Sequence, residues 1–285
     1  MARLPAPLTL LIITVVLVLS AACDGGQASG DLKAFVIADA HKVTITNYDA
    51  QLAADSIPKV LRKSRDTEAH KANIEEFVWP YGRENGRVDQ SLYIEARSGD
   101  YLLHRGRFDF EAISKRFNES PGLTHVEDWA GSDTDAWFTE DAFTFVLLAE
   151  HSLAGSGVWK MLEALRTAFT EGTGFVDESS GIGRLLYGID PDSLESEITA
   201  DCWITEGEKL SLEGCVGASW SVSGDDGSAR TSYAVLFDSP QSAEAALPEI
   251  REELEDTARW FEDSVELSDV EIDGELITFE ARHLE

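Results

Sequence analysis

The feature that most constrains the fold of this chain is a strand that leads through an aromatic–aspartate step into a helix. The step occurs three times, as Tyr48-Asp49, Phe108-Asp109 and Phe237-Asp238. An aspartate side chain, or that of Ser239 ahead of Pro240, accepts a hydrogen bond from an unpaired amide in a first helical turn. These residues are therefore predicted to cap helices rather than to perform chemistry.

Turn signals separate other strand-like segments. Ser98-Gly99-Asp100, Gly224-Asp225-Asp226-Gly227 and Asp273-Gly274 each lie between two such segments, as in β-hairpins. Hairpins mixed with strand-to-helix steps predict an α+β fold with antiparallel or mixed sheets, not a regularly alternating parallel fold. The repeated strand–helix–strand–strand order predicts two ferredoxin-like α/β sandwich units. The polar stretch Asp190-Pro191-Asp192-Ser193 divides them into 31–192 and an acidic unit, 193–285.

The N-terminus has the layout of a bacterial export signal. Arg3 precedes an apolar stretch, residues 8–19, that is shorter than the ~20 residues of a membrane span. Small residues then lead to Cys23, and a polar, glycine-containing tether follows at 24–30. This pattern predicts a signal peptide over 1–22 and a flexible segment over 23–30.

The run Leu19-Ser20-Ala21-Ala22-Cys23 resembles the lipobox of bacterial lipoproteins, with Ser20 where that family usually has Leu. The resemblance implies that Cys23 carries lipid and becomes the first residue of the mature chain. The protein would then be anchored to the cell membrane on its extracytoplasmic side. Two alternatives stay open, namely plain secretion after ordinary cleavage and an uncleaved N-terminal anchor helix.

The number of cysteines agrees with export. The chain has three cysteines, and an odd cysteine in an exported protein needs an explanation. Lipidation of Cys23 leaves Cys202 and Cys215 as a pair for an oxidising compartment. A hairpin centred on Glu208-Lys209 would place the pair at disulfide distance. Two buried free thiols are the alternative.

The charge of the chain is concentrated in its C-terminal part. Residues 31–120 contain 14 Lys and Arg against 15 Asp and Glu, whereas residues 121–285 contain 8 against 37. Such a surface repels nucleic acid and attracts a basic protein partner or cations. The alternative is a solvated acidic surface that keeps the protein soluble.

A local basic cluster stands out against this background, formed by Lys59, Arg62, Lys63 and Arg65. If the N-terminus is anchored, this cluster is a candidate contact for an anion or for anionic lipid headgroups. The alternative is that it pairs with the acidic C-terminal part.

No catalytic constellation is visible in the sequence. Gly155-Ser156-Gly157 lacks the full nucleophile-elbow pattern, so Ser156 is predicted to be a helix cap. The six histidines are not spaced as metal ligands on one helix face. Neither a metal site nor a cofactor is predicted.

Most of the chain resembles, loosely, a group of bacterial envelope lipoproteins with no assigned activity. The resembling parts are the lipobox, the turn Arg105-Gly106-Arg107-Phe108-Asp109-Phe110 and the strand and helix within 143–169. We therefore expect a non-enzymatic, lipid-anchored envelope protein that acts as a binding or interaction module. The alternative is a cell-surface hydrolase whose site gathers distant residues, for instance His151 and Ser156.

Lipidation can be tested directly. In a bacterium fed labelled palmitate, we expect the protein to carry label and its Cys23→Ser variant to lose it, because the thiol is the attachment point. A Cys202→Ser/Cys215→Ser double variant should keep the label. Wild-type protein that is exported without label would favour plain secretion.

Overall fold

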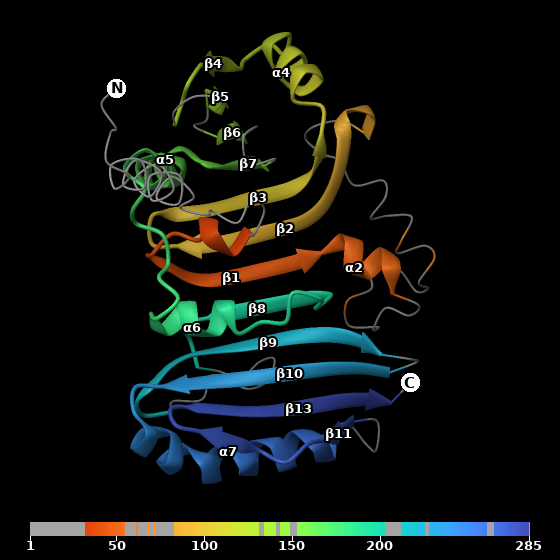
Figure 1. Cartoon of the computed structure of the whole chain (residues 1–285), viewed down its shortest axis with the longest axis vertical. Coiled ribbons are helices and arrows are strands. Elements are labelled where there is room, and N and C mark those ends of the chain that lie inside the picture. The colour runs from red at the N-terminus through yellow and green to blue at the C-terminus, as the bar shows by residue number, and fades with distance from the viewer. Residues whose placement is uncertain are drawn as a thin grey trace, which may run out of the picture. The chain divides into compact units, whose positions relative to one another are not determined.

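One large antiparallel sheet forms the framework of the fold (Figure 1). The computed structural model describes residues 32–54, 61, 68, 71, 83–130, 134–140, 143–148, 153–202, 212–225, 228–260 and 265–284. The strands are β1 (Ala40–Asn47), β2 (Gly86–Ala96), β3 (Gly99–Phe108), β4 (Thr124–Val126), β5 (Thr134–Phe138), β6 (Phe143–Leu148), β7 (Leu153–Val158), β8 (Glu195–Thr199), β9 (Cys215–Asp225), β10 (Ser228–Phe237), β11 (Val265–Leu267), β12 (Glu271–Asp273) and β13 (Leu276–Leu284). The helices are η1 (Leu32–Phe35), α2 (Tyr48–Ala53), η2 (Arg83–Asn85), α4 (Phe110–Asn118), α5 (Trp159–Glu171), α6 (Gly181–Tyr187) and α7 (Pro240–Trp260).

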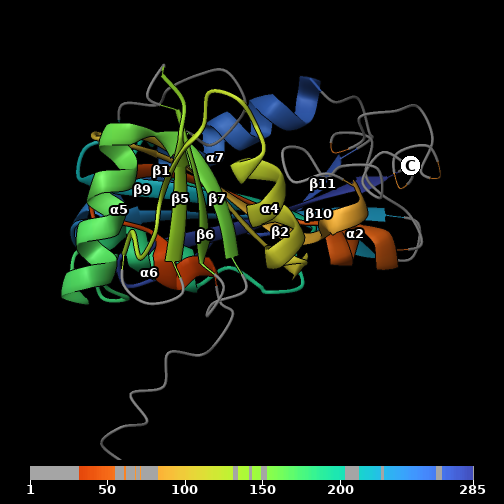
Figure 2. The same ribbon diagram turned by 90° about the horizontal axis from the view of Figure 1, so that it is seen from above.

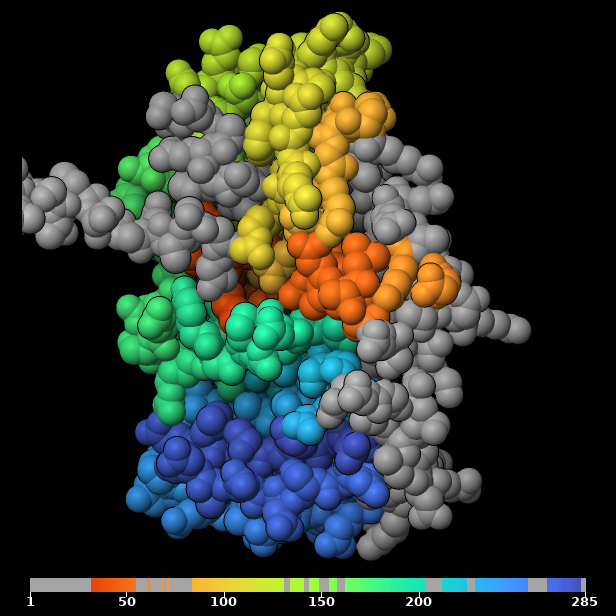
Figure 3. Space-filling view, turned by 45° about the vertical axis from the view of Figure 1, so that its right-hand side comes forward, coloured from red at the N-terminus to blue at the C-terminus, as the bar shows by residue number. Residues whose placement is uncertain are grey.

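The strand order places β8 at the junction between the N-terminal and C-terminal strands. The order is β11-β13-β10-β9-β8-β1-β2-β3-β7-β6-β5-β4, with β12 also paired to β13. Ile198 of β8 lies opposite Val43 on one side and Ser219 on the other. In the space-filling view, residues of β1 and α2 (orange), the α6–β8 region (green to teal) and the C-terminal strands (blue) follow one another in that order (Figure 3). The sheet is therefore continuous from one half of the chain to the other.

The predicted α+β class is confirmed, but two ferredoxin-like units are not. A ferredoxin-like unit is a split β-α-β arrangement, whereas β1 and β2, joined through α2, are direct antiparallel neighbours here. Residues 32–285 form one compact unit. The predicted boundary after Asp192 precedes β8, which pairs with strands on both sides of that boundary.

The hairpins predicted from turn signals are present. β2 pairs with β3 across Arg97 and Ser98, and β12 pairs with β13 across Gly274 and Glu275. β9 pairs with β10 from Ser228↔Asp225 onward. Gly274 has φ +62, a conformation that glycine adopts without steric cost. Local turn chemistry therefore sets these pairings.

Alternation along the strands gives the sheet two different covered faces. In β10, Val235 and Phe237 pack in a core with Ile250 of α7. The intervening Leu236 belongs to the main core, together with Leu185 of α6. Figure 2 shows α6 and α7 on opposite sides of the sheet. Consecutive residues of one strand thus contribute to cores on opposite faces.

A third core lies beneath α4. Ile113 and Phe117 of this helix are buried against Trp137 of β5. The ring centroids of Phe117 and Trp137 are 5.3 Å apart in a T-shaped contact, a favourable arrangement for aromatic pairs. α4 therefore anchors the β4–β7 end of the sheet.

The predicted helix caps are partly confirmed. The side chain of Asp109 accepts a hydrogen bond from the amide of Ala112 at 2.9 Å. Ser239 accepts one from the amide of Ser242 at 3.2 Å. At the first step, however, Asn47 rather than Asp49 caps α2, because the chain enters the helix two residues earlier than predicted.

η1 is held to the sheet by one tyrosine. The buried hydroxyl of Tyr101 donates to the carbonyl of Phe35 at 2.8 Å and accepts from the amide of Ile37 at 3.2 Å. Burial raises the pKa of Tyr101 well above its usual value, so the hydroxyl keeps its proton and its donor role. The segment just after the predicted tether is therefore docked on the core.

α7 combines an apolar face with an acidic one. Ala243 and Ile250 are fully buried, whereas Glu244, Glu249 and Glu252 are exposed. No helix in the described ranges has the length and apolar character needed to cross a bilayer.

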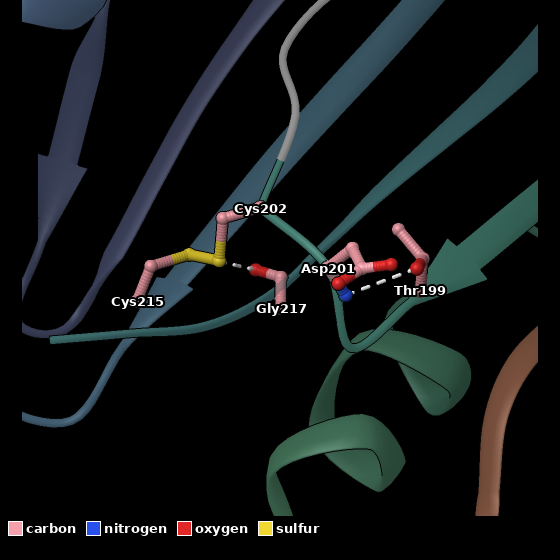
Figure 4. Close-up of a disulfide and its surroundings, with 5 residues drawn as sticks. All are labelled: Thr199, Asp201, Cys202, Cys215 and Gly217. Atoms are coloured by element: carbon pink, nitrogen blue, oxygen red, sulfur yellow. Dashed lines mark hydrogen bonds between the residues drawn. A yellow bond between two sulfur atoms is a disulfide. The ribbon is translucent and has the colours of Figure 1, made fainter. Parts of the chain in front are cut away.

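The predicted disulfide is present (Figure 4). Cys202 lies three residues after the end of β8 and Cys215 begins β9, and their Cα atoms are 6.2 Å apart. The bond closes the connection between two adjacent strands. The predicted hairpin tip, Glu208-Lys209, lies outside the described residues.

We expect the Cys202→Ser/Cys215→Ser variant to unfold with a free energy about 3 kcal/mol below that of the wild type, because a loop of this length gains that much entropy when released. Urea unfolding followed by circular dichroism measures the difference. A reductant should destabilise the wild type and leave the variant unchanged. The Cys23→Ser variant should be destabilised by reductant as the wild type is. If reductant did not change the unfolding free energy of the wild type, the prediction would be wrong.

Candidate functional site

A groove of about 710 Å³ opens on the α6 face of the sheet. Its floor is formed by β9, β10 and β13. One wall is α6 with the turn that follows it, and the other is the segment 268–271. Figure 3 shows the green-to-teal surface around α6 next to the blue surface of the C-terminal strands. Segments far apart in sequence, for instance those of Arg184 and Glu271, therefore line one site.

The floor of the groove is rich in hydroxyl groups. It contains Ser219 and Ser221 of β9, Ser232 of β10, and Thr278 and Glu280 of β13. Ser221 lies opposite Ser232, and Ser232 lies opposite Glu280. Because side chains alternate along a strand, these small polar residues share the face opposite that of α7.

Two of these hydroxyls are available to a ligand. Ser232 donates a hydrogen bond to Oε1 of Glu280 at 3.3 Å. Within the described part of the chain, no hydrogen bond is formed by the hydroxyls of Ser219 and Ser221. Ser219 is only 9% exposed, but its hydroxyl is not among the buried polar atoms that lack a partner, so it reaches the solvent of the groove. A ligand in the groove could bond to this hydroxyl in place of water.

The 268–271 wall is positioned by its own hydrogen bonds to β13. The amide of Ser268 donates to the carbonyl of Glu280 at 2.9 Å. The amide of Glu280 donates to the hydroxyl of Ser268 at 2.8 Å. β11 and β12 pair with β13 on either side of this contact. The segment between them, which includes Asp269, is therefore held at the border of the groove.

The groove is electronegative. Asp269, Glu271 and Glu280 line it, against a single cationic residue, Arg184. Arg184 forms an ion pair with Glu275, which belongs to the turn beside the groove. No ion pair involves Asp269 or Glu271 among the residues that the structure describes. The net field in the groove therefore favours a cation.

A buried serine–histidine hydrogen bond lies elsewhere, on neighbouring strands β2 and β3. Ser91 Oγ is 2.6 Å from Nδ1 of His104, and the residues are 5% and 1% exposed. Burial lowers the pKa of His104 to about 4. Burial also raises the pKa of Tyr48, which bonds to Ser91. Neither Ser91 nor His104 lines the groove, so the pair acts as a neutral contact within the core.

The serine proposed from sequence as a helix cap has a different position. Ser156 lies in β7, is 7% exposed and pairs with Leu102 and Phe145 of the adjacent strands. The cap prediction is wrong because β7 continues to Val158 before α5 begins. His151, its possible catalytic partner, lies outside the described residues.

The other predicted site residues are distributed as follows. Cys23 and the basic cluster Lys59, Arg62, Lys63 and Arg65 lie outside the described residues, so their roles stay predictions. In the acidic stretch before β8, the amide of Asp192 donates to the side chain of Asp190 at 2.9 Å, which agrees with a turn. Within the described residues, no three His, Cys, Asp or Glu side chains gather as a metal group would require.

Sequence reasoning missed the groove itself. The signal was the alternation of small polar residues in Gly217-Ala218-Ser219-Trp220-Ser221 with buried apolar ones, which a search for a nucleophile does not detect. The floor is assembled by β10, which pairs with β9 on one side and with β13 on the other, and α7, β11 and β12 separate β10 from β13 in the sequence. Such an arrangement becomes visible only when the sheet is assembled.

The chain is similar in fold to TP0453. Crystal form IV of TP0453 aligns with a TM-score of 0.50 at 8% identity, over 90% of this chain and 94% of that one. Form III gives 0.48 at 9% identity over 90% and 95%, and form I gives 0.49 at 10% over 89% and 93%. At this identity TP0453 shows the fold alone. No protein-family model and no curated protein sequence matches the chain.

The lowered pKa of His104 predicts a pH-dependent stability. In the unfolded chain this histidine takes up a proton near pH 6.5, whereas in the folded chain it does so near pH 4. The unfolding free energy should therefore fall as pH drops from 6.5 to 4, by about 3 kcal/mol in total. Urea unfolding at a series of pH values measures this slope.

In His104→Asn, most of the fall in unfolding free energy between pH 6.5 and pH 4 should be lost, whatever the stability of this variant at neutral pH. His41→Asn, at an exposed position, serves as the control and should keep it. An unchanged slope in His104→Asn would show that other groups cause the pH dependence.

Proposed function

We propose that this protein is a lipid-anchored bacterial envelope protein, non-enzymatic, that binds a partner or ligand in the groove between α6 and the C-terminal edge of the sheet. The lipid anchor is Cys23. The observation that carries the binding role is the groove floor, where Ser219, a residue only 9% exposed, presents a hydroxyl that has no partner among the described residues.

The cellular location is supported by the sequence and by the cysteines. The lipobox-like run ends at Cys23, and the disulfide between Cys202 and Cys215 is of a kind that persists in oxidising compartments outside the cytoplasm. The disulfide uses both cysteines other than Cys23. If Cys23 is not lipidated, the same observations favour plain secretion.

The binding role is supported by the size and chemistry of the groove. Ligand pockets of proteins commonly have volumes of roughly 300–1,000 Å³ with a few well-placed polar groups, and this groove falls within that range. Its polar groups come from paired strands, which hold them rigidly. A groove that combines apolar residues, such as Leu185 and Ile189, with hydroxyls and carboxylates suits recognition of a partner.

The hydrolase alternative gains no support from the described residues. Ser156 is buried in β7, away from the groove. The Ser91–His104 pair is closed to solvent, whereas a nucleophile must reach its substrate.

Cross-linking in the envelope tests the proposal. Full-length protein with an affinity tag is cross-linked in its own bacterium, purified and analysed by mass spectrometry, as wild type and as Ser221→Phe. The new ring fills the groove floor, so we expect at least one cross-linked partner to be lost.

Ser223→Phe is the matched control. Ser223 lies two residues further along β9, on the same face of the strand, and it does not line the groove. The control should keep the partner. Equal recovery with both variants, or equal loss, would count against binding in the groove.

A further inference from the structure

We infer that the groove binds a basic peptide segment of a protein partner, lying extended along the acidic 268–271 wall. This inference rests on the proposed function, because it names the ligand class of the same site. It follows from the charges of the groove wall, the ion pairs already formed beside the groove and on its floor, and the hydroxyls of the floor.

The acidic wall has charges without counterions. Asp269 and Glu271 are exposed and line the groove. Neither has an ion-pair partner within the described residues. The charges are two residues apart along an edge segment, so they are spread in a line rather than concentrated at one point. A ligand with spaced positive charges, such as a chain containing Lys or Arg, matches this arrangement.

Two intramolecular contacts show that neighbouring carboxylates accept guanidinium groups. Arg184 pairs with Glu275 beside the groove. Arg230 Nε is 3.7 Å from Oε2 of Glu280, on the groove floor. Arg230 and Glu280 are 44% and 45% exposed, so this surface pair is weak. A basic side chain from a partner can therefore compete for Glu280 at little cost.

The hydroxyl-rich floor matches a peptide backbone. A serine hydroxyl can both donate and accept a hydrogen bond, and each peptide unit offers one donor and one acceptor. Ser219 and Ser221 are successive same-face residues of β9, about 7 Å apart by strand geometry. Their unpaired hydroxyls can bind successive same-side groups of an extended segment. The hydroxyls of the floor thus suit the main chain of a peptide, and the carboxylates of the wall suit its basic side chains.

Binding of a fluorescein-labelled oligolysine peptide to the purified full-length protein tests the inference, with fluorescence anisotropy as the readout. We expect binding that weakens as salt is added, and no binding of oligoglutamate. The Asp269→Asn/Glu271→Gln variant should bind roughly tenfold more weakly, since two exposed ion pairs are lost. Ser219→Ala/Ser221→Ala should also weaken binding, without a change in charge.

The matched control is Glu249→Gln/Glu252→Gln on α7, which removes the same charge from exposed positions outside the groove. Its affinity should stay near that of the wild type. An equal loss of affinity in the control would show that oligolysine binds by general electrostatic attraction, and it would overturn the inference. If spermine bound more tightly than the peptide, the ligand class of the groove would be a small polyamine and not a basic peptide.

The experiment also separates this inference from the proposed function. If oligolysine does not bind but Ser221→Phe still loses its cross-linked partner, the groove is a binding site and its ligand is not a basic peptide. If both results are negative, the groove has neither role.

Discussion

The β8 ladder is the constraint on which the rest of the structure depends. This five-residue strand pairs on one side with β1 and on the other with β9. The backbone bonding continues beyond its ends, since the amide of Asn47 donates to the carbonyl of Leu194 at 3.0 Å and the amide of Ala200 donates to that of His41 at 2.7 Å. Ile198, next to the central residue of this strand, is fully buried. Without β8, the N-terminal and C-terminal strands would form two sheets with exposed edges.

The same sheet explains why a groove exists where it does. The step from β10 into α7 sends the helix to the face of Val235 and Phe237. On the other face α6, a helix of seven residues, ends at Tyr187. Beyond Tyr187, the strands carry serine and threonine on this face. They lack the large apolar residues against which a further helix would pack. The acidic 268–271 segment borders the uncovered part, so the floor and the charge come from independent features of the chain.

The sequence predicted those features that arise from neighbouring residues. The hairpins at 98–100 and 273–274 follow from turn chemistry, Asp109 and Ser239 act as helix caps, and the disulfide follows from the number of cysteines. The order of strands brought together from distant parts of the chain could not be read in the same way. β1 and β8 are about 150 residues apart, and nothing local to either strand specifies the other. The groove depends on such pairings, so its residues appeared in the sequence only as polar positions of a strand.

The separation between β1 and β8 also has a consequence for how the protein is made. A chain emerges from the ribosome with its N-terminus first. β1 and β2 can pair early, because only residues 48–85 lie between them and β8 is made much later. The other edge of β1 then stays open until residues 195–199 arrive. A chain made in this way passes through a stage in which an unfinished strand edge can pair with another chain, so the last third of the sequence protects the first third against aggregation.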